Sequence, residues 1–210
     1  MNQKNQIHIV IYSDFICPWC WIGISRLHRA LQTRPQLVTR LEWRPFQLNP
    51  DMPAGGMDRQ TYLTAKFGHA VEQAYAPIRQ AGEAEGLDFR WHMITTTPNS
   101  LKAHALMQWV QTHHPDFAPT MAEHLFRSYF NQGNDLEDET SLRSLLPSQI
   151  KADDTLFSPG QLAMIRKMDQ SARRLGIGGV PFFVTEGQYT LAGAASPKAW
   201  QAILDLGCAT

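Results

Sequence analysis

Cysteines, net charge and long apolar runs are all scarce in this sequence. Its 210 residues include three cysteines, too few for a disulfide scaffold, so each cysteine needs its own explanation. The 19 basic and 19 acidic residues cancel, so no long-range field favours nucleic acid or an anionic membrane as a partner. No segment approaches the ~18 apolar residues of a membrane span, and the N-terminus is too polar for a secretory signal. We therefore expect a cytoplasmic protein that binds neither nucleic acid nor membrane.

The N-terminal part of the chain predicts a strand, a helix and a second strand. The composition, 43% hydrophobic and 10% aromatic, is sufficient for a large core. Residues 7–12 are β-branched and end at Ser13-Asp14, as a buried strand does before a turn. Apolar residues recur at helical spacing over residues 21–31. Residues 38–48 predict the second strand.

Helical periodicity dominates the middle of the chain, where we find no convincing strand from residue 57 to about residue 150. The helices expected there are residues 60–85 with a break near Gly68, 100–114, 120–131 and 139–145. The C-terminal part predicts a helix at 160–175 capped by Ser158, a hairpin of 182–184 and 189–191 turning at Gly187, and a helix at 197–206. This order predicts an α/β domain of residues 1–56 and 158–210, interrupted by a helical domain of residues 57–157.

The motif Cys17-Pro18-Trp19-Cys20 carries the clearest chemical signal. It lies between a predicted strand and a predicted helix, and the positive end of a helix dipole favours a thiolate. Cys17 can then attack a disulfide, and Cys20, one turn later, can resolve the mixed disulfide. The competing interpretations are a structural cysteine pair and a zinc site. Zinc needs four ligands, and Cys208 near the C-terminus has no partner at zinc spacing, so we expect no metal and treat Cys208 as an incidental thiol.

A second signal is the glycine-rich approach Gly178-Gly179-Val180-Pro181 to the apolar residues 182–184. A proline cannot donate to a sheet ladder, so Pro181 belongs at a strand start or at an edge. A cis bond before Pro181 would account for the glycines, but the spacing alone does not establish one.

Four blocks of sequence carry a family resemblance: SDFICPWCWIG at 13–23, WRPFQLNP at 43–50, LFRSYFNQG at 125–133 and GIGGVPFFV at 176–184. Together they resemble the FrnE-type branch of the DsbA-like thioredoxin family over nearly the whole chain. The resemblance implies a thioredoxin fold with a large all-helical insertion and thiol-disulfide oxidoreductase activity at Cys17 and Cys20. It also implies a cis Pro181 against the cysteines and a Val180 backbone that pairs with an extended substrate strand.

The resemblance suggests further substrate-binding residues. It places Asn99 and His104 on the helical domain, facing the cleft. His104 borders the apolar stripe of its helix, so a half-exposed packing residue is the competing interpretation. Pro18 and Trp19 lie between the cysteines, and we expect Trp19 to contact substrate and Trp21 to lie in the core.

The chain departs from the family pattern at one position. Thioredoxins and many DsbA relatives carry a buried acid six positions before the first cysteine, where this chain has Ile11. Asp14 and Glu42 are the candidates to replace that acid. Turn hydrogen bonding competes with this role for Asp14, and a solvated strand position competes with it for Glu42.

The leading hypothesis is a thiol-disulfide oxidoreductase that acts on protein or small-molecule thiols and disulfides. It needs no bound cofactor, and glutathione can serve as its redox partner. The alternative is a glutathione-dependent isomerase or transferase of the 2-hydroxychromene-2-carboxylate isomerase or kappa class, whose fold is similar. In those proteins the position of Cys17 is usually serine, so two cysteines favour redox chemistry. A third hypothesis is a non-catalytic binding module. The sequence leaves open the direction of exchange and the choice between monomer and homodimer.

Overall fold

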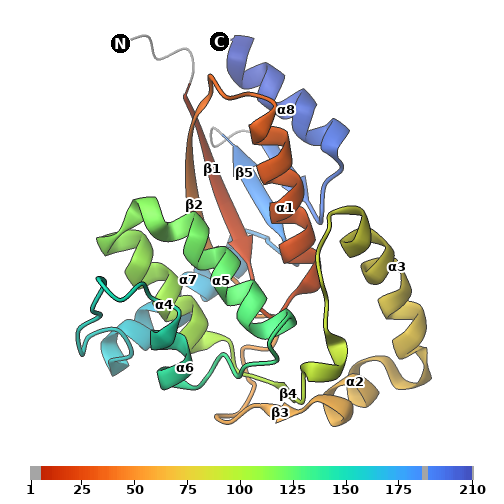
Figure 1. The fold of residues 1–210 in the computed structure, drawn as a ribbon, viewed down its shortest axis with the longest axis vertical. Coiled ribbons are helices and arrows are strands. Elements are labelled where there is room, and N and C mark those ends of the chain that lie inside the picture. The colour runs from red at the N-terminus through yellow and green to blue at the C-terminus, as the bar shows by residue number, and fades with distance from the viewer. Residues whose placement is uncertain (1–5, 186–188, 210) are drawn as a thin grey trace.

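The structure, a computed structural model, is built on a four-stranded sheet in the order β2-β1-β5-β6 (Figure 1). It describes residues 6–185 and 189–209, with side chains described up to residue 206. The strands are β1 (Gln6–Ser13), β2 (Val38–Pro45), β5 (Phe182–Thr185) and β6 (Tyr189–Ala192). β1 pairs in parallel with β2 and antiparallel with β5, which pairs antiparallel with β6. The expected hairpin is confirmed, while its expected turn at Gly187 lies outside the described residues.

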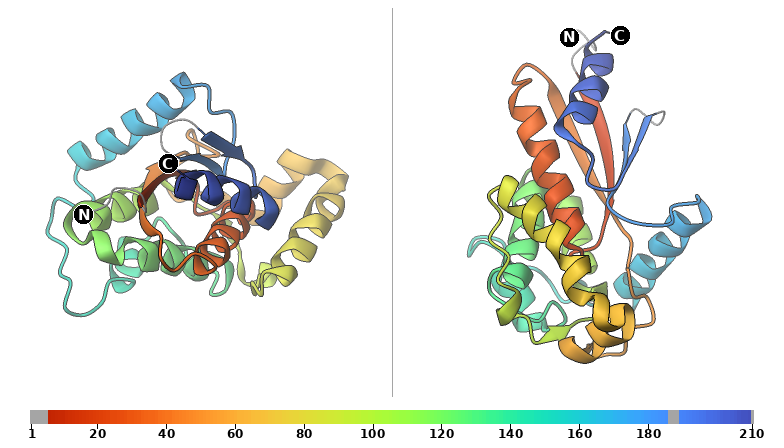
Figure 2. Two further views of the ribbon diagram at one scale, coloured as in Figure 1. Left: turned by 90° about the horizontal axis from the view of Figure 1, so that it is seen from above. Right: turned by 90° about the vertical axis from the view of Figure 1, so that its right-hand side faces the viewer.

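Helices cover both faces of this sheet. One face carries α1 (Pro18–Gln32) and α8 (Pro197–Ala209), and the other carries α7 (Pro159–Arg174), as the right-hand view of Figure 2 shows. The alternation of β1 explains the first face, because Ile7, Ile9 and Ile11 are all buried in the core that also contains Trp200 of α8. Each such side chain contributes about 1.5–3 kcal/mol by its burial.

α7 begins and packs as its sequence predicts. The Ser158 hydroxyl accepts a hydrogen bond from the N–H of Gln161 at 3.3 Å, and Pro159 occupies the first helical position. Ala172 of α7 then packs with Phe46 and Ile177 on the second face of the sheet.

A helical lobe lies between β2 and α7 in the chain. Its helices are α2 (Arg59–Phe67), α3 (Val71–Ala84), α4 (Leu101–His113), α5 (Ala118–Phe130) and α6 (Glu139–Ser144). The expected break near Gly68 is confirmed, since Gly68 has a φ of +56° between α2 and α3. The α/β sheet with a helical insertion is therefore the fold that the sequence predicts.

One strand prediction was wrong, and a second strand is confirmed but is shorter than predicted. The lobe does contain strands, because β3 (Met57–Asp58) pairs antiparallel with β4 (Thr96–Thr97). Two-residue strands show no alternation that a sequence could reveal. The predicted strand 38–48 ends at Pro45, because the following N–H groups of Gln47 and Leu48 donate to aspartate side chains instead of a neighbouring strand.

Polar and aromatic contacts attach the lobe to α1. Arg26 and Arg29 of α1 both pair with the nearly buried carboxylate of Glu85, which follows α3, at 2.9 and 3.0 Å. The indole N–H of Trp21 donates to Glu123 of α5 at 2.9 Å. Trp21 is buried, as expected, and these contacts hold the lobe along α1 from its first turn to Arg29.

Candidate active site

Cys17 occupies the N-cap position of α1. Its backbone is extended, with φ −96° and ψ 113°, and Pro18 supplies the first helical residue. No side chain caps this helix, and its first turn contains no acidic residue. The Cys17 sulfur therefore lies at the positive end of the helix dipole, where a thiolate is stabilised.

Cys20 lies one turn into α1 in a different environment. Its side chain is 0% exposed, and the backbone N–H of Asp14 donates to its Sγ at 3.5 Å. Burial is the main reason that the pKa of Cys20 is raised well above its usual value; a hydrogen bond with Cys17 and the charge of Cys17 raise it further. The N–H of Asp14 acts in the opposite direction. Both cysteines are free in this structure, and Cys20 is held as a thiol.

The chain brings a cis proline to the cysteines from the start of β5. The Val180–Pro181 peptide bond is cis, which confirms the expectation from the resemblance. The thiol of Cys17 faces the carbonyl oxygen of Val180, with an Sγ–O distance of 3.7 Å. Val180 and Cys17 are thus neighbours although 163 residues separate them.

A pocket of about 360 Å³ gives access to Cys17. The residue is 4% exposed, and this pocket is the route by which a substrate can reach its sulfur. Four of the predicted site residues line it, namely Cys17, Pro18, Trp19 and Val180. The opposite wall comes from the lobe and consists of Arg59, Tyr62, Lys66, Phe67, Ala74, Tyr75, Ile78 and Thr97.

Arg59 is the main feature of this wall that the sequence did not reveal. Its guanidinium donates to the hydroxyls of Tyr75, Tyr129 and Thr97, the last two at 3.4 and 3.0 Å. Among residues 6–185 and 189–206, no carboxylate forms an ion pair with Arg59. Burial raises the pKa of both tyrosines, so these phenols are neutral partners that leave the cation uncompensated.

The family of the chain follows from its sequence profile. The DSBA-like thioredoxin domain matches residues 8–205, almost the whole length. The chain belongs to this family. This is a family of thiol-disulfide oxidoreductases.

Solved structures agree with this membership. A probable DsbA oxidoreductase of Streptomyces coelicolor has a TM-score of 0.78 and 25% identity, over 96% of this chain and 89% of its own. A 2-hydroxychromene-2-carboxylate isomerase has a TM-score of 0.69 and 13% identity, over 96% of each chain. The cytosolic disulfide reductase DsbM of Pseudomonas aeruginosa, solved with GSH, has a TM-score of 0.65 and 17% identity, over 97% of this chain and 100% of its own. The last two show the shared fold, and the set fits the FrnE-type branch.

One curated relative matches a short stretch of this DsbA-like chain. The protein YwbO of Bacillus subtilis (strain 168) is 36% identical over 44 residues. The aligned stretch spans 21% of this chain and 20% of YwbO.

Four predicted site residues do not line the pocket of this DsbA-like domain: Cys20 and Pro181, described above, and Asn99 and His104. Asn99 donates to the carbonyl of Met52 at 2.6 Å and accepts from Gln47 and from the N–H of Leu101, both at 3.0 Å. These contacts fix the start of α4 to the segment that follows β2. His104 is 3% exposed rather than half-exposed, and its Nε2 lies 3.5 Å from Oδ1 of Asp14.

The candidates for the missing acid lie in different places. Ile11 is buried in the core, as its strand position requires. Asp14 is 0% exposed and accepts from the N–H groups of Ile16 at 3.4 Å and Leu48 at 2.6 Å, the first of which is the predicted turn bond. Glu42 lies on β2 and pairs with His8 at 3.0 Å.

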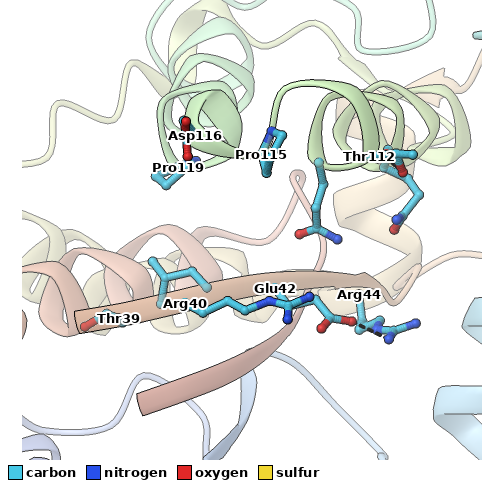
Figure 3. Close-up of a pocket in the computed structure, with 11 residues that line it drawn as sticks. Thr39, Arg40, Glu42, Arg44, Thr112, Pro115, Asp116 and Pro119 are labelled. Carbon is cyan, nitrogen blue, oxygen red and sulfur yellow. Dashed lines mark hydrogen bonds and ion pairs between the residues drawn. The ribbon is translucent and has the colours of Figure 1, made fainter. Parts of the chain in front are cut away.

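A larger pocket lies away from the cysteines. Its volume is about 730 Å³, and Figure 3 shows β2 on one side, with Arg40, Glu42 and Arg44, and the segment containing Pro115 and Asp116 on the other. Neither cysteine lines it, so it is not the site of thiol chemistry.

Within the described part of the chain, no group of three or more His, Cys, Asp or Glu side chains could hold a metal ion. None of the helices described combines the length with the apolar character that crossing a bilayer requires.

Proposed function

We propose that this protein is a thiol-disulfide oxidoreductase in which Cys17 is the nucleophile and Cys20 the resolving thiol. The observation that carries the proposal is the pair itself. Cys17 begins a helix and lines a pocket beside a cis proline, whereas Cys20 lies buried one turn further along the helix. The helix dipole favours the thiolate of Cys17, and the thiolate is the form that attacks a disulfide.

The reaction proceeds in two exchanges. The Cys17 thiolate attacks one sulfur of the substrate disulfide, the S–S bond breaks, and the other sulfur leaves as a thiolate. Cys20 then attacks Sγ of Cys17, which closes the protein disulfide and releases the second substrate thiolate. The protein is oxidised and the substrate reduced, and the reverse sequence transfers a disulfide to a substrate. The Val180 backbone beside Cys17 offers an edge with which an extended substrate can pair.

The charge of the pocket favours an anionic small thiol as the redox partner. Arg59 and Lys66 both line it, and neither forms an ion pair within the described part of the chain. Glutathione carries two carboxylates and one ammonium group, and the structurally similar DsbM was solved with GSH. We therefore propose glutathione as a redox partner, with no bound cofactor, alongside protein disulfides. A cytoplasmic location, as for DsbM, is part of this proposal, with a monomer or homodimer as the acting unit.

Cysteine variants test the proposal directly. The protein is equilibrated with a series of reduced and oxidised glutathione ratios, quenched in acid and analysed by mass spectrometry. Cys17→Ser should abolish disulfide exchange, whereas Cys20→Ser should accumulate a mixed disulfide with glutathione at Cys17. Cys208→Ser is the matched control and should behave as the natural protein. Full exchange in the Cys17→Ser protein would exclude the mechanism.

A neutral substrate tests the role of the cations. Arg59→Met should raise the KM for oxidised glutathione by about 10- to 100-fold, because a charge-assisted hydrogen bond contributes about 1.5–3 kcal/mol. The KM for the uncharged 2-hydroxyethyl disulfide should change little. Arg40→Met, at an exposed arginine of the larger pocket, should leave both values unchanged. An equal rise for both substrates with Arg59→Met would show a general disturbance of the pocket.

The second candidate is a glutathione-dependent isomerase, favoured by the similarity to 2-hydroxychromene-2-carboxylate isomerase. That activity would require glutathione to convert an aromatic substrate without net oxidation. It would also persist in Cys17→Ser, since a serine can hold the glutathione thiolate. Loss of all activity in Cys17→Ser separates the two candidates.

A further inference from the structure

Asp14 and His104 form a buried pair behind the cysteines. Their side chains are 0% and 3% exposed, and Nε2 of His104 lies 3.5 Å from Oδ1 of Asp14. Within the described residues, this Nε2 atom has no hydrogen-bond partner, although it is fully buried. A buried polar atom without a partner costs free energy, so its retention points to a role that the resting state does not show.

The pair adjoins the resolving thiol and not the pocket. The backbone N–H of Asp14 contacts Sγ of Cys20 at 3.5 Å, and neither Asp14 nor His104 lines the cysteine pocket. His104 comes from α4 and packs on the ring of Phe15, the residue after Asp14. The pair therefore connects the helical lobe to the loop that leads into α1.

Few other ionisable groups face the pair. From α5, the phenol of Tyr129 feels the charge of Asp14, but burial raises its pKa and keeps it neutral. From α2, Arg59 reaches that phenol. From α7, Asp169 is occupied by Arg173 and by the N–H of Gln47. From α1 comes Cys20, whose sulfur contacts the N–H of Asp14. From β2, Arg44 lines a small cavity together with His104 and pairs with Glu42. Within the described residues, His104 is the one basic side chain within 4.0 Å of the Asp14 carboxylate.

Closing the protein disulfide requires a base that removes the proton of Cys20. Cys20 must lose its proton to attack Cys17, yet its sulfur is fully buried and has no contact with solvent. We propose that Asp14 and His104 act as a buried acid–base pair that takes this proton when the disulfide closes and returns it when the disulfide is reduced. This inference rests on the proposed function.

The proton moves from Sγ of Cys20 to the Asp14 carboxylate, next to which Nε2 of His104 lies at 3.5 Å. The electron pair left on Sγ of Cys20 forms the bond to Sγ of Cys17. The bond between Cys17 and the substrate sulfur breaks, and its electron pair leaves with the substrate thiolate. The two cysteines are oxidised and the substrate is reduced. His104 acts through Asp14 and is a positioning residue.

A reagent that releases one coloured thiolate in each exchange separates the attack by Cys20 from the first attack by Cys17. Reduced protein carrying Cys208→Ser is mixed with 5,5′-dithiobis(2-nitrobenzoate) in a stopped-flow instrument. The attack by Cys17 releases one coloured thiolate, and the attack by Cys20 releases the second. Asp14→Asn should slow the second release about 100-fold at neutral pH, and His104→Gln about tenfold, since general acid–base catalysis contributes about 10²–10⁴. The first release should stay within about twofold of the parent rate.

The pH dependence of the second release rate is a readout that a purely structural role of Asp14 and His104 would not change. In the parent, the rate of the second release should depend only weakly on pH, because the pair accepts the proton of Cys20. In Asp14→Asn this rate should rise about tenfold per pH unit, because hydroxide then has to generate the thiolate. His113→Gln, at an exposed histidine of the same helix, is the matched control and should reproduce the parent in both releases.

Each outcome supports or overturns either the role of the pair or the proposed function. Selective slowing of the second release, with the altered profile, supports the pair. An unchanged second release in both variants overturns the pair and leaves the oxidoreductase proposal intact, because two releases still occur. Equal slowing of both releases shows that Asp14 and His104 only hold the fold, and this also overturns the inference. A parent that gives no second release contradicts the proposed function itself.

Discussion

Gly23 controls how closely α1 approaches the cis proline. A Cβ added at this position would lie 2.9 Å from Cγ of Pro181, 3.3 Å from the Cα of Ala194 and 3.4 Å from Cζ of Phe183. Carbon atoms in contact are normally about 3.5–4.0 Å apart, so α1 and Pro181 must separate by at least about 0.6 Å. A proline ring, a backbone atom and the end of a buried aromatic ring have little freedom to move.

Two opposing effects set the change in unfolding free energy that Gly23→Ala causes. Gly23→Ala gains about 1 kcal/mol from the higher helix propensity of alanine. Forcing an extra methyl group into a packed core costs about 1–3 kcal/mol. We expect a net loss of unfolding free energy between about 0 and 2 kcal/mol. Gly160→Ala is the matched control, because Gly160 lies in the first turn of α7 with no atom within 4 Å of an added Cβ. It should gain up to about 1 kcal/mol.

Urea unfolding followed by tryptophan fluorescence measures both variants, and the difference between them isolates the clash at about 1–3 kcal/mol. The same displacement should alter the Sγ–O approach between Cys17 and Val180 and slow the first thiolate release from a disulfide reagent. A Gly23→Ala protein that is as stable as Gly160→Ala and reacts at the parent rate would refute the close packing of α1 on Pro181.

Three further variants test separate features of the structure. In Cys17→Ser, the buried Cys20 should resist iodoacetamide at pH 8 until denaturant is added, because its pKa is raised; rapid labelling of the folded protein would contradict this. Burial lowers the pKa of His28 from 6.5, only partly opposed by Glu123, so the folded state binds fewer protons than the unfolded one. The resulting stability is complete above pH 6.5 and falls as the pH drops towards the folded value. His28→Gln should reduce this loss between pH 7.5 and 5.5 in urea titrations, whereas the exposed His92→Gln should not. Leu125→Ala, at a fully buried position of α5, should cost about 2–5 kcal/mol in the same titration, and a loss below 1 kcal/mol would show a looser core.

The parts of the fold that local sequence determines were predictable. The β-branched run of β1, the Ser158–Pro159 start of α7 and the break at Gly68 each depend on a few neighbouring residues. The two-residue strands β3 and β4 were missed because their pairing depends on contacts 38 to 40 positions apart, and neither segment has a pattern of its own. Short non-local pairing leaves no local signal.

The residues of the candidate site also divide into those that a local motif predicts and those that depend on contacts far apart in the chain. Cys17, Pro18 and Trp19 were found because a single motif contains them. Arg59 was missed because its significance lies in two tyrosines that are 16 and 70 residues away along the chain. The cis bond at Pro181 required a family resemblance, since the local sequence left its geometry open.

The two cysteines differ in chemistry because the helix places them differently. Cys17 occupies the N-cap position of α1 and lines a pocket, whereas Cys20, three residues later, turns inward to the N–H of Asp14. A disulfide substrate can reach Cys17 and cannot reach Cys20, so attack at Cys17 must come first whatever the direction of net exchange. Once the substrate is attached, Cys20 can release its thiolate from inside the protein by attacking Sγ of Cys17. The ease with which Cys20 loses its proton therefore limits how long the mixed disulfide survives. A change in its surroundings alters that lifetime without altering the first attack.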